Sequence, residues 1–206
     1  MVVDQRTSDP PPSVWRRLAA FAVDYVFIAL YLVLLTLVAV FIPSTTRVFQ
    51  TPATGQAIGI LVLTLPVVLY FSLWEGSRYE ATPGKRAVGI AVVRSSREPL
   101  SRSRGLVRNG LKLAPWELAH TFIWRIPGWP QPTGELPTWI VAGFIAVWLL
   151  VLLNLVLAWK SPTGQTAYDW VADSVVVRTV RSPDARLPIS RRGERTAGQP
   201  GADHIS

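Results

Sequence analysis

One apolar run constrains this chain more than any other feature. It extends from Leu18 to Ile42 and contains a single charged residue, Asp24. The run exceeds the roughly 20 residues that a helix needs to cross a bilayer. A carboxylate inside such a span costs about 2.5–3.5 kcal/mol on insertion scales, so it usually faces protein or water and marks a functional position. The sequence therefore predicts a membrane protein whose function depends on its rare intramembrane polar groups.

The composition agrees with a small polytopic membrane protein, because 50% of the 206 residues are hydrophobic. The absence of cysteine excludes disulfides, thiol catalysis and cysteine metal sites, and two histidines are too few for a histidine-built metal site. The net charge of +8 comes from cations that flank the apolar runs. This distribution indicates attraction to anionic lipid headgroups rather than nucleic-acid binding. We expect neither a cofactor nor a metal.

Two further apolar runs follow, at residues 57–74 and 139–159. Pro66 lies near the middle of the first of these, where a proline kinks a helix and frees a carbonyl. The last run is bracketed by Trp139 and Trp159, as expected for aromatic residues at membrane interfaces. Both runs are therefore predicted to cross the membrane.

The basic residues predict the orientation. Residues 76–113 and the tail from Lys160 onward are strongly basic, whereas the loop at 43–56 carries one cation. Basic segments stay in the cytoplasm, so an even number of membrane crossings must separate residues 76–113 from the basic tail, and the run at 139–159 supplies one of them. The second of these crossings must lie within residues 106–126, which span only if they are buried among other helices; a re-entrant segment is the alternative. Four polar residues interrupt that segment: Arg108, Lys112, Glu117 and His120.

Two short segments rich in β-branched residues, 87–93 and 174–180, are predicted to pair as strands on the cytoplasmic side. The fold class is thus an all-α transmembrane, polytopic helical bundle of about four membrane segments, three strong and one weak, with a small cytoplasmic strand pair. The expected elements are helices at about 14–42, 57–75, 106–125 and 138–159 and strands at about 88–93 and 174–180. They form a domain at 14–180, flanked by a disordered N-terminal segment, 1–13, and a disordered basic tail, 181–206.

Arg17 and Asp24 share one face of the first predicted helix, about 10 Å apart along its axis. That separation is long for a direct pair, so we expect each to find a partner on another element. Arg16 and Arg17 are also explained by interfacial anchoring. Asp24 is either a titrating site or a structural lock between helices, because buried carboxylates serve both purposes.

Two other patterns have simple structural explanations. Residues 82–86 could be mistaken for a phosphate loop, but they lack its glycine spacing and predict a tight turn at headgroup level. Asp169 and Asp173 stand at i and i+4, where two carboxylates could bind a cation. Helix capping and pairing with the basic loop is the interpretation we favour for them. No catalytic arrangement is present, so the sequence gives no support for an enzyme.

Three segments in order carry a family resemblance: 15–24, with Trp-Arg-Arg-Leu before Asp24; 75–93, with Glu-Gly and Thr-Pro-Gly-Lys-Arg; and 166–177, around Asp169. Together they resemble the RDD family of bacterial membrane proteins over residues 14–178. By position, Arg17 matches the family arginine, and Asp24 and Asp169 match its two aspartates. The family usually has histidine before the second aspartate, where this chain has Tyr168, and Gly-Thr where it has Asp173-Ser174.

The resemblance implies a fold and a membrane location more firmly than an activity. Some members are regarded as cation–proton antiporters, and a eukaryotic branch as assembly factors. We therefore expect a small-cation/proton transporter using Asp24; the alternative is a non-transporting scaffold that binds protein partners. The ion-coupling or structural polar residues are Asp24, Arg17 and Asp169, and the accessory polar residues are Arg16, Glu75, Lys85, Arg108 and Glu117.

The expected location is a bacterial plasma membrane, with both termini in the cytoplasm. No cleavable signal peptide is evident before the first apolar run, so we expect that run to remain as an anchor. Four helices are few for a transporter, so that function would require a homo-oligomer. The identity of any protein partner is left open.

Overall fold

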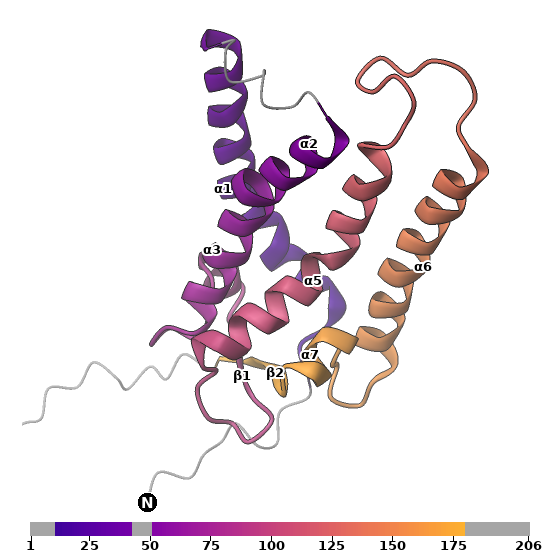
Figure 1. Cartoon of the computed structure of the whole chain (residues 1–206). Helices are drawn as coiled ribbons and strands as arrows, with labels where there is room; N and C mark the ends of the chain where they lie inside the picture. Colours follow the sequence, from indigo (N-terminus) through magenta and orange to yellow (C-terminus); the bar gives the residue numbers. More distant parts are fainter. Residues whose placement is uncertain (1–10, 43–50, 180–206) are drawn as a thin grey trace, which may run out of the picture.

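A computed structural model describes residues 11–42 and 51–179 (Figure 1). Three of its helical spans are long and apolar enough to cross a membrane: α1 (Val14–Phe41), Pro52–Glu75 and α6 (Thr138–Lys160). A fourth helix, α5 (Arg102–Ile123), lies between α3 (Leu65–Glu75) and α6, and a small sheet closes one end of the bundle. Most of the predicted N-terminal segment and all of the predicted basic tail lie outside the described residues.

The second span consists of three consecutive pieces: α2 (Pro52–Gly59), a π-helical turn η3 (Ile60–Thr64) and α3 (Leu65–Glu75). It begins earlier than the hydropathy predicts, because Thr51 and Thr54 form a capping box and Pro52 occupies the first turn.

Pro66 explains the π-helical turn. It has no N–H, so the carbonyl of Val62, four residues before it, loses its usual α-helical donor. The hydroxyl of Tyr31 on α1 donates to that oxygen at 2.6 Å. The predicted freed carbonyl is therefore confirmed, and its hydrogen bond ties the second span to α1.

The α5 helix has its polar side inward. Its buried residues include Arg108 and Asn109, which are 3% and 0% exposed, whereas Val107 and Trp116 are about half exposed. At 1.5 Å per residue its 22 residues are long enough to cross the hydrocarbon core. Hydropathy alone misses such a helix, because Arg108 and Lys112 in its middle turns face the interior while apolar side chains such as Val107 and Trp116 face outward.

The strand pair is confirmed. Strands β1 (Ile90–Arg94) and β2 (Ser174–Arg178) are antiparallel, with Val92 opposite Val176. Short helices precede both strands: α4 (Pro83–Ala87) and α7 (Ala167–Val171).

Both faces of the sheet are buried. One face packs with Ala20 of α1 and Leu100, and the other packs with Ala81. Gly89, with a φ of +68°, makes the turn from α4 into β1, a backbone conformation that glycine adopts without strain. The sheet therefore fixes α4 and α7 against the ends of the long helices.

Candidate functional site: a buried ionic cluster beside a cavity

Glu75, at the last position of α3, is the acceptor of a fully buried network. Arg108 donates to both of its carboxylate oxygens, at 2.9 and 3.1 Å, and the Asn109 amide donates at 2.9 Å. Lys85 Nζ of α4 also donates to Glu75. One carboxylate thus joins α3 to α4 and α5.

Asp169 is the second buried acceptor. The Nε of Arg108 donates to it at 2.8 Å, the Ser174 hydroxyl at 3.1 Å, and Arg17 Nη1 lies 3.7 Å away. The N–H and hydroxyl of Thr166 complete a capping box that starts α7. Arg108 therefore bridges Glu75 and Asp169 with different nitrogens of one guanidinium, which its planar fork of donors permits.

The electrostatics of Asp169 follow from these contacts. Burial alone would raise the pKa of this carboxyl, but Arg108, the N–H of Thr166 and Arg17 outweigh burial and hold the pKa below its usual value of 3.8. Asp169 therefore stays ionised at neutral pH.

Asp24 is also buried, at 1% exposed, but its partners are different. It accepts hydrogen bonds from the Tyr70 hydroxyl at 3.0 Å, the Thr82 hydroxyl at 2.5 Å and the N–H of Gly84 at 2.8 Å. Within the described residues it makes no ion pair. A Cβ at Gly84 would lie 2.1 Å from the carbonyl oxygen of Ala20, so only glycine permits this contact. Asp24 thus fastens α4 onto α1.

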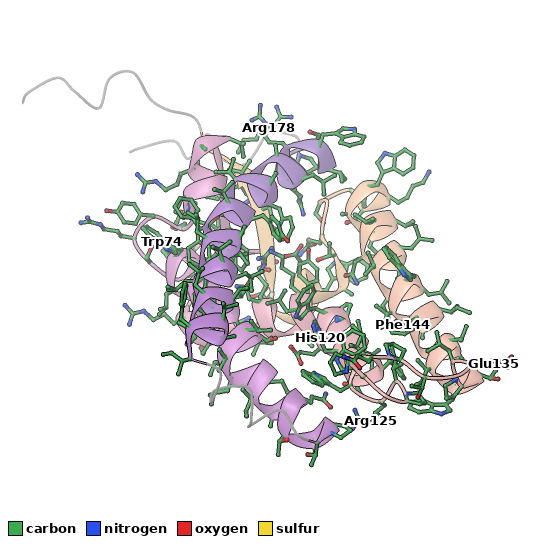
Figure 2. The ribbon with its side chains drawn as sticks, turned by 90° about the horizontal axis from the view of Figure 1, so that it is seen from above. Trp74, His120, Arg125, Glu135, Phe144 and Arg178 are labelled. Atoms are coloured by element: carbon green, nitrogen blue, oxygen red, sulfur yellow. The ribbon has the colours of Figure 1, made fainter. Side chains whose placement is uncertain are left out.

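A cavity of about 450 Å³ lies between α1, α5 and α6, above the sheet and α7. Figure 2 shows polar side-chain tips gathered in the interior between α1 and α6. The charged residues lining the cavity are Arg17, Lys85, Arg108, Lys112 and Asp24, so four cations face one acid. Two of those cations, Lys85 and Arg108, are already paired with buried carboxylates.

Lys112 and Arg17 have unused donors. Lys112 Nζ lies 4.0 Å from the ring centroid of Phe71, and no carboxylate in the described part of the chain forms an ion pair with it. Arg17 reaches Asp169 through Nη1, but its Nε and Nη2 are buried and bond to nothing among residues 11–42 and 51–179. Lys112 is therefore a cavity-lining cation without a carboxylate partner in the described residues, and Arg17 has only part of its guanidinium paired.

The structure brings most of the predicted polar residues together. Arg17, Asp169, Glu75, Lys85 and Arg108 form one connected cluster, beside which Asp24 lies in the same cavity wall. Two predicted accessory residues lie elsewhere. Arg16 is exposed, and Glu117 accepts a hydrogen bond from Thr64, at the end of the π-helical turn.

Asp169 and Asp173 do not share a helix face. The α7 helix ends at Val171, and Asp173 follows with a φ of +51°. Its carboxylate pairs with Arg94 and Arg104, each at 3.2 Å. The favoured interpretation, helix capping by one aspartate and pairing of the other with the basic loop, is therefore confirmed.

Sequence reasoning did not assign four residues of this region to the site: Asn109, Lys112, Tyr70 and Thr82. A signal existed for Lys112 and Asn109. In a segment that crosses only if buried, every polar residue needs a partner. The partners of Asp24 had no such signal, because a hydroxyl and a backbone N–H are not distinctive in sequence.

In its described residues the chain is a helical bundle with a buried ionic cluster, three spans long and apolar enough to cross a membrane, and a small sheet at one end. The sequence profile of the RDD family matches residues 11–173, and the chain belongs to this family. Neither the curated proteins nor the solved structures contain a match to it. The residues matched by position to the family arginine and second aspartate, Arg17 and Asp169, lie in contact, whereas Asp24 acts at a separate point.

Proposed function

We propose that this RDD protein binds an anionic ligand at membrane depth, in the cavity between α1, α5 and α6. One observation carries the proposal: Lys112 and Arg17 both line the cavity, Lys112 forms no ion pair with a described carboxylate, and Arg17 keeps two buried nitrogens without a hydrogen-bond partner among the described residues. Taking a cation out of water costs several kcal/mol unless a counter-charge offsets it. A bound anion supplies that counter-charge. The role is one of binding or transport, without a chemical reaction.

Asp24 has a structural role in this proposal. A carboxylate that already accepts bonds from Tyr70, Thr82 and Gly84 has its acceptor sites largely occupied. To coordinate a cation it would have to release α4. The hydrogen bonds that hold α4 on α1 through Asp24 would also suit a scaffold protein. A scaffold role, however, does not explain why incompletely paired cations line a cavity.

Proton-linked cation exchange is the second candidate. It is favoured by the presence of Asp24 and Lys112 in one cavity wall. Loss of a proton from Lys112 would leave Asp24 free to attract a small cation, and the cation would leave when the lysine regained its proton. This candidate retains Asp24 as the coupling group and requires its hydrogen bonds to open in each cycle.

The proposed topology has four crossings, with α5 as the weak one, and both termini on the cytoplasmic side of a bacterial plasma membrane. The inward polar face of α5 supports it. A homo-oligomer remains the expected assembly if the protein transports its ligand, because four helices offer few surfaces for a complete pathway.

The test uses the purified protein in a neutral detergent. Dodecyl phosphate should raise its melting temperature, and Lys112→Met should remove most of that increase without lowering the melting temperature of the free protein. No increase with dodecyl phosphate would overturn the proposal. In proteoliposomes, sodium- or potassium-driven proton movement that Asp24→Asn abolishes, in a variant that melts like wild type, would favour the second candidate instead.

A further inference from the structure

We propose that the occupant of the cavity is an anionic phospholipid, with its phosphate at Arg17 and Lys112 and an acyl chain along α5 and α6. This inference rests on the proposed anion site and names its ligand. Three observations support it: the cavity has a polar end and an apolar wall, the outer faces of α1 and α6 are apolar, and the Oδ1 atom of Asn154 has no hydrogen-bond donor among the described residues.

The cavity has a polar end and an apolar wall. Arg17, Tyr168 and Thr166 line it near α7 and the sheet. The rest of the wall is largely apolar: Pro115, Trp116 and Ala119 from α5, and Val147, Val151 and Leu155 from α6. A small inorganic anion would use the polar end and leave the apolar wall without a partner. An anion that carries a hydrocarbon chain uses both.

The outside of the bundle continues this apolar wall. Leu152 and Leu149 of α6 are 56% and 60% exposed, and Leu30 of α1 is 63% exposed. Such surfaces lie against lipid chains in a membrane protein. α1 and α6 touch each other little, so a lipid could enter from the bilayer between them. The cavity accepts the headgroup phosphate and the first part of a chain, and the remaining hydrocarbon lies in the bilayer.

Asn154 supplies the third unsatisfied group. It is the polar residue that interrupts the last apolar run, and it lines the same cavity. Its amide nitrogen donates to the carbonyl of Leu150 at 2.9 Å, but its buried Oδ1 accepts from no group among the described residues. A hydroxyl on a lipid headgroup would donate to this oxygen. Phosphatidylglycerol combines that hydroxyl with a phosphate and a net negative charge, so it is the appropriate probe.

The experiment measures binding of short-chain lipids to the purified full-length protein in neutral detergent, by melting temperature and native mass spectrometry. The probes are dioctanoyl phosphatidylglycerol, dioctanoyl phosphatidylcholine and inorganic phosphate. We expect one phosphatidylglycerol per chain, bound on the order of tenfold more tightly than phosphatidylcholine, and no comparable effect of phosphate. Lys112→Met should weaken phosphatidylglycerol binding on the order of tenfold.

Matched variants separate the charge from the chain. Ala119→Phe fills the apolar wall and should weaken phosphatidylglycerol binding, whereas Ala146→Phe, on an exposed face of α6, should not. Lys160→Met removes an exposed cation of α6 and should have no effect. Because Lys112 has no paired carboxylate, its replacement orphans no acid, and the variant is expected to fold.

The possible outcomes are distinct. If inorganic phosphate stabilises the protein as well as the lipid does, and Ala119→Phe changes nothing, the ligand is a free anion; the lipid inference is then wrong and the proposed anion site stands. If neither phosphatidylglycerol nor inorganic phosphate binds, both the inference and the proposed function are wrong. The same conclusion follows if Lys112→Met and Lys160→Met bind phosphatidylglycerol equally well. Equal binding of phosphatidylcholine and phosphatidylglycerol overturns the lipid inference alone.

Discussion

Arg108 holds Glu75 and Asp169 with a single guanidinium, through Nη1 to the first and Nε to the second. The two carboxylates belong to segments far apart in the chain, α3 and α7. The contact therefore fixes the end of the second apolar span against the short helix that leads into β2.

Replacing Arg108 with lysine should break this bridge. A lysine keeps the charge but presents one nitrogen, so at most one of the two carboxylates stays paired. Loss of a buried partner costs about 3–5 kcal/mol, and the yield of folded protein should fall sharply. The matched control is Arg102→Lys, on an exposed position of the same helix. Size-exclusion profiles in detergent measure both, and equal profiles would show that the bridge contributes little.

Gly84 gives a test of the lock between α4 and α1. Gly84→Ala places a Cβ 2.1 Å from the carbonyl oxygen of Ala20 and 2.7 Å from Cγ of Asp24, so the two helices must separate. Overpacking of this kind costs about 1–3 kcal/mol or more. The melting temperature in detergent should fall.

Gly110→Ala is the control for that substitution. A Cβ at Gly110 meets nothing within 4 Å, and alanine favours a helix by up to about 1 kcal/mol over glycine. This variant should melt at or above the wild-type temperature. A Gly84→Ala protein that melts like Gly110→Ala would rule out the close approach of α4 to Asp24.

Much of this architecture could be predicted from particular residues. The apolar run around Asp24 and the β-branched segments predicted the first helix and the paired strands, because each depends on local chemistry. Pro66 also predicted a freed backbone carbonyl, which the structure shows at Val62. These features need no knowledge of what lies across the bundle.

The partners of the buried charges could not be predicted in the same way. If Asp24 is a lock, either a hydrogen bond or an ion pair on another element was expected to hold it, and the structure shows hydrogen bonds from Tyr70, Thr82 and the N–H of Gly84. Lys112 was recognised as an interruption of a weak span and not as a wall of a cavity. Both depend on how the helices are packed, which spacing along the chain does not specify.

The pH dependence of stability should reflect Asp169. The pKa of Asp169 is held below 3.8 in the folded protein. Its ionised form therefore stabilises the fold fully at pH values above the pKa that the carboxyl has in the unfolded chain. This contribution is lost as the pH falls through the lower, folded pKa. At pH 7, Asp169→Asn should therefore be destabilised relative to wild type, and the difference should shrink as the pH falls below about 4. Denaturation in detergent from pH 7 to pH 3 measures it, and a difference independent of pH would exclude this origin.

The four-crossing topology makes a prediction about two loops. Ser95 lies in the turn after β1, and Glu135 lies in the loop between α5 and α6, at the edge of the bundle in Figure 2. If α5 crosses the membrane, these positions lie on opposite sides of it. The chain has no cysteine, so single cysteines can be introduced without background. Glu135→Cys should react with an impermeant maleimide added to intact cells, and Ser95→Cys should react only after lysis. Protection of both positions in intact cells would mean that α5 is re-entrant, and the bundle would then have three crossings.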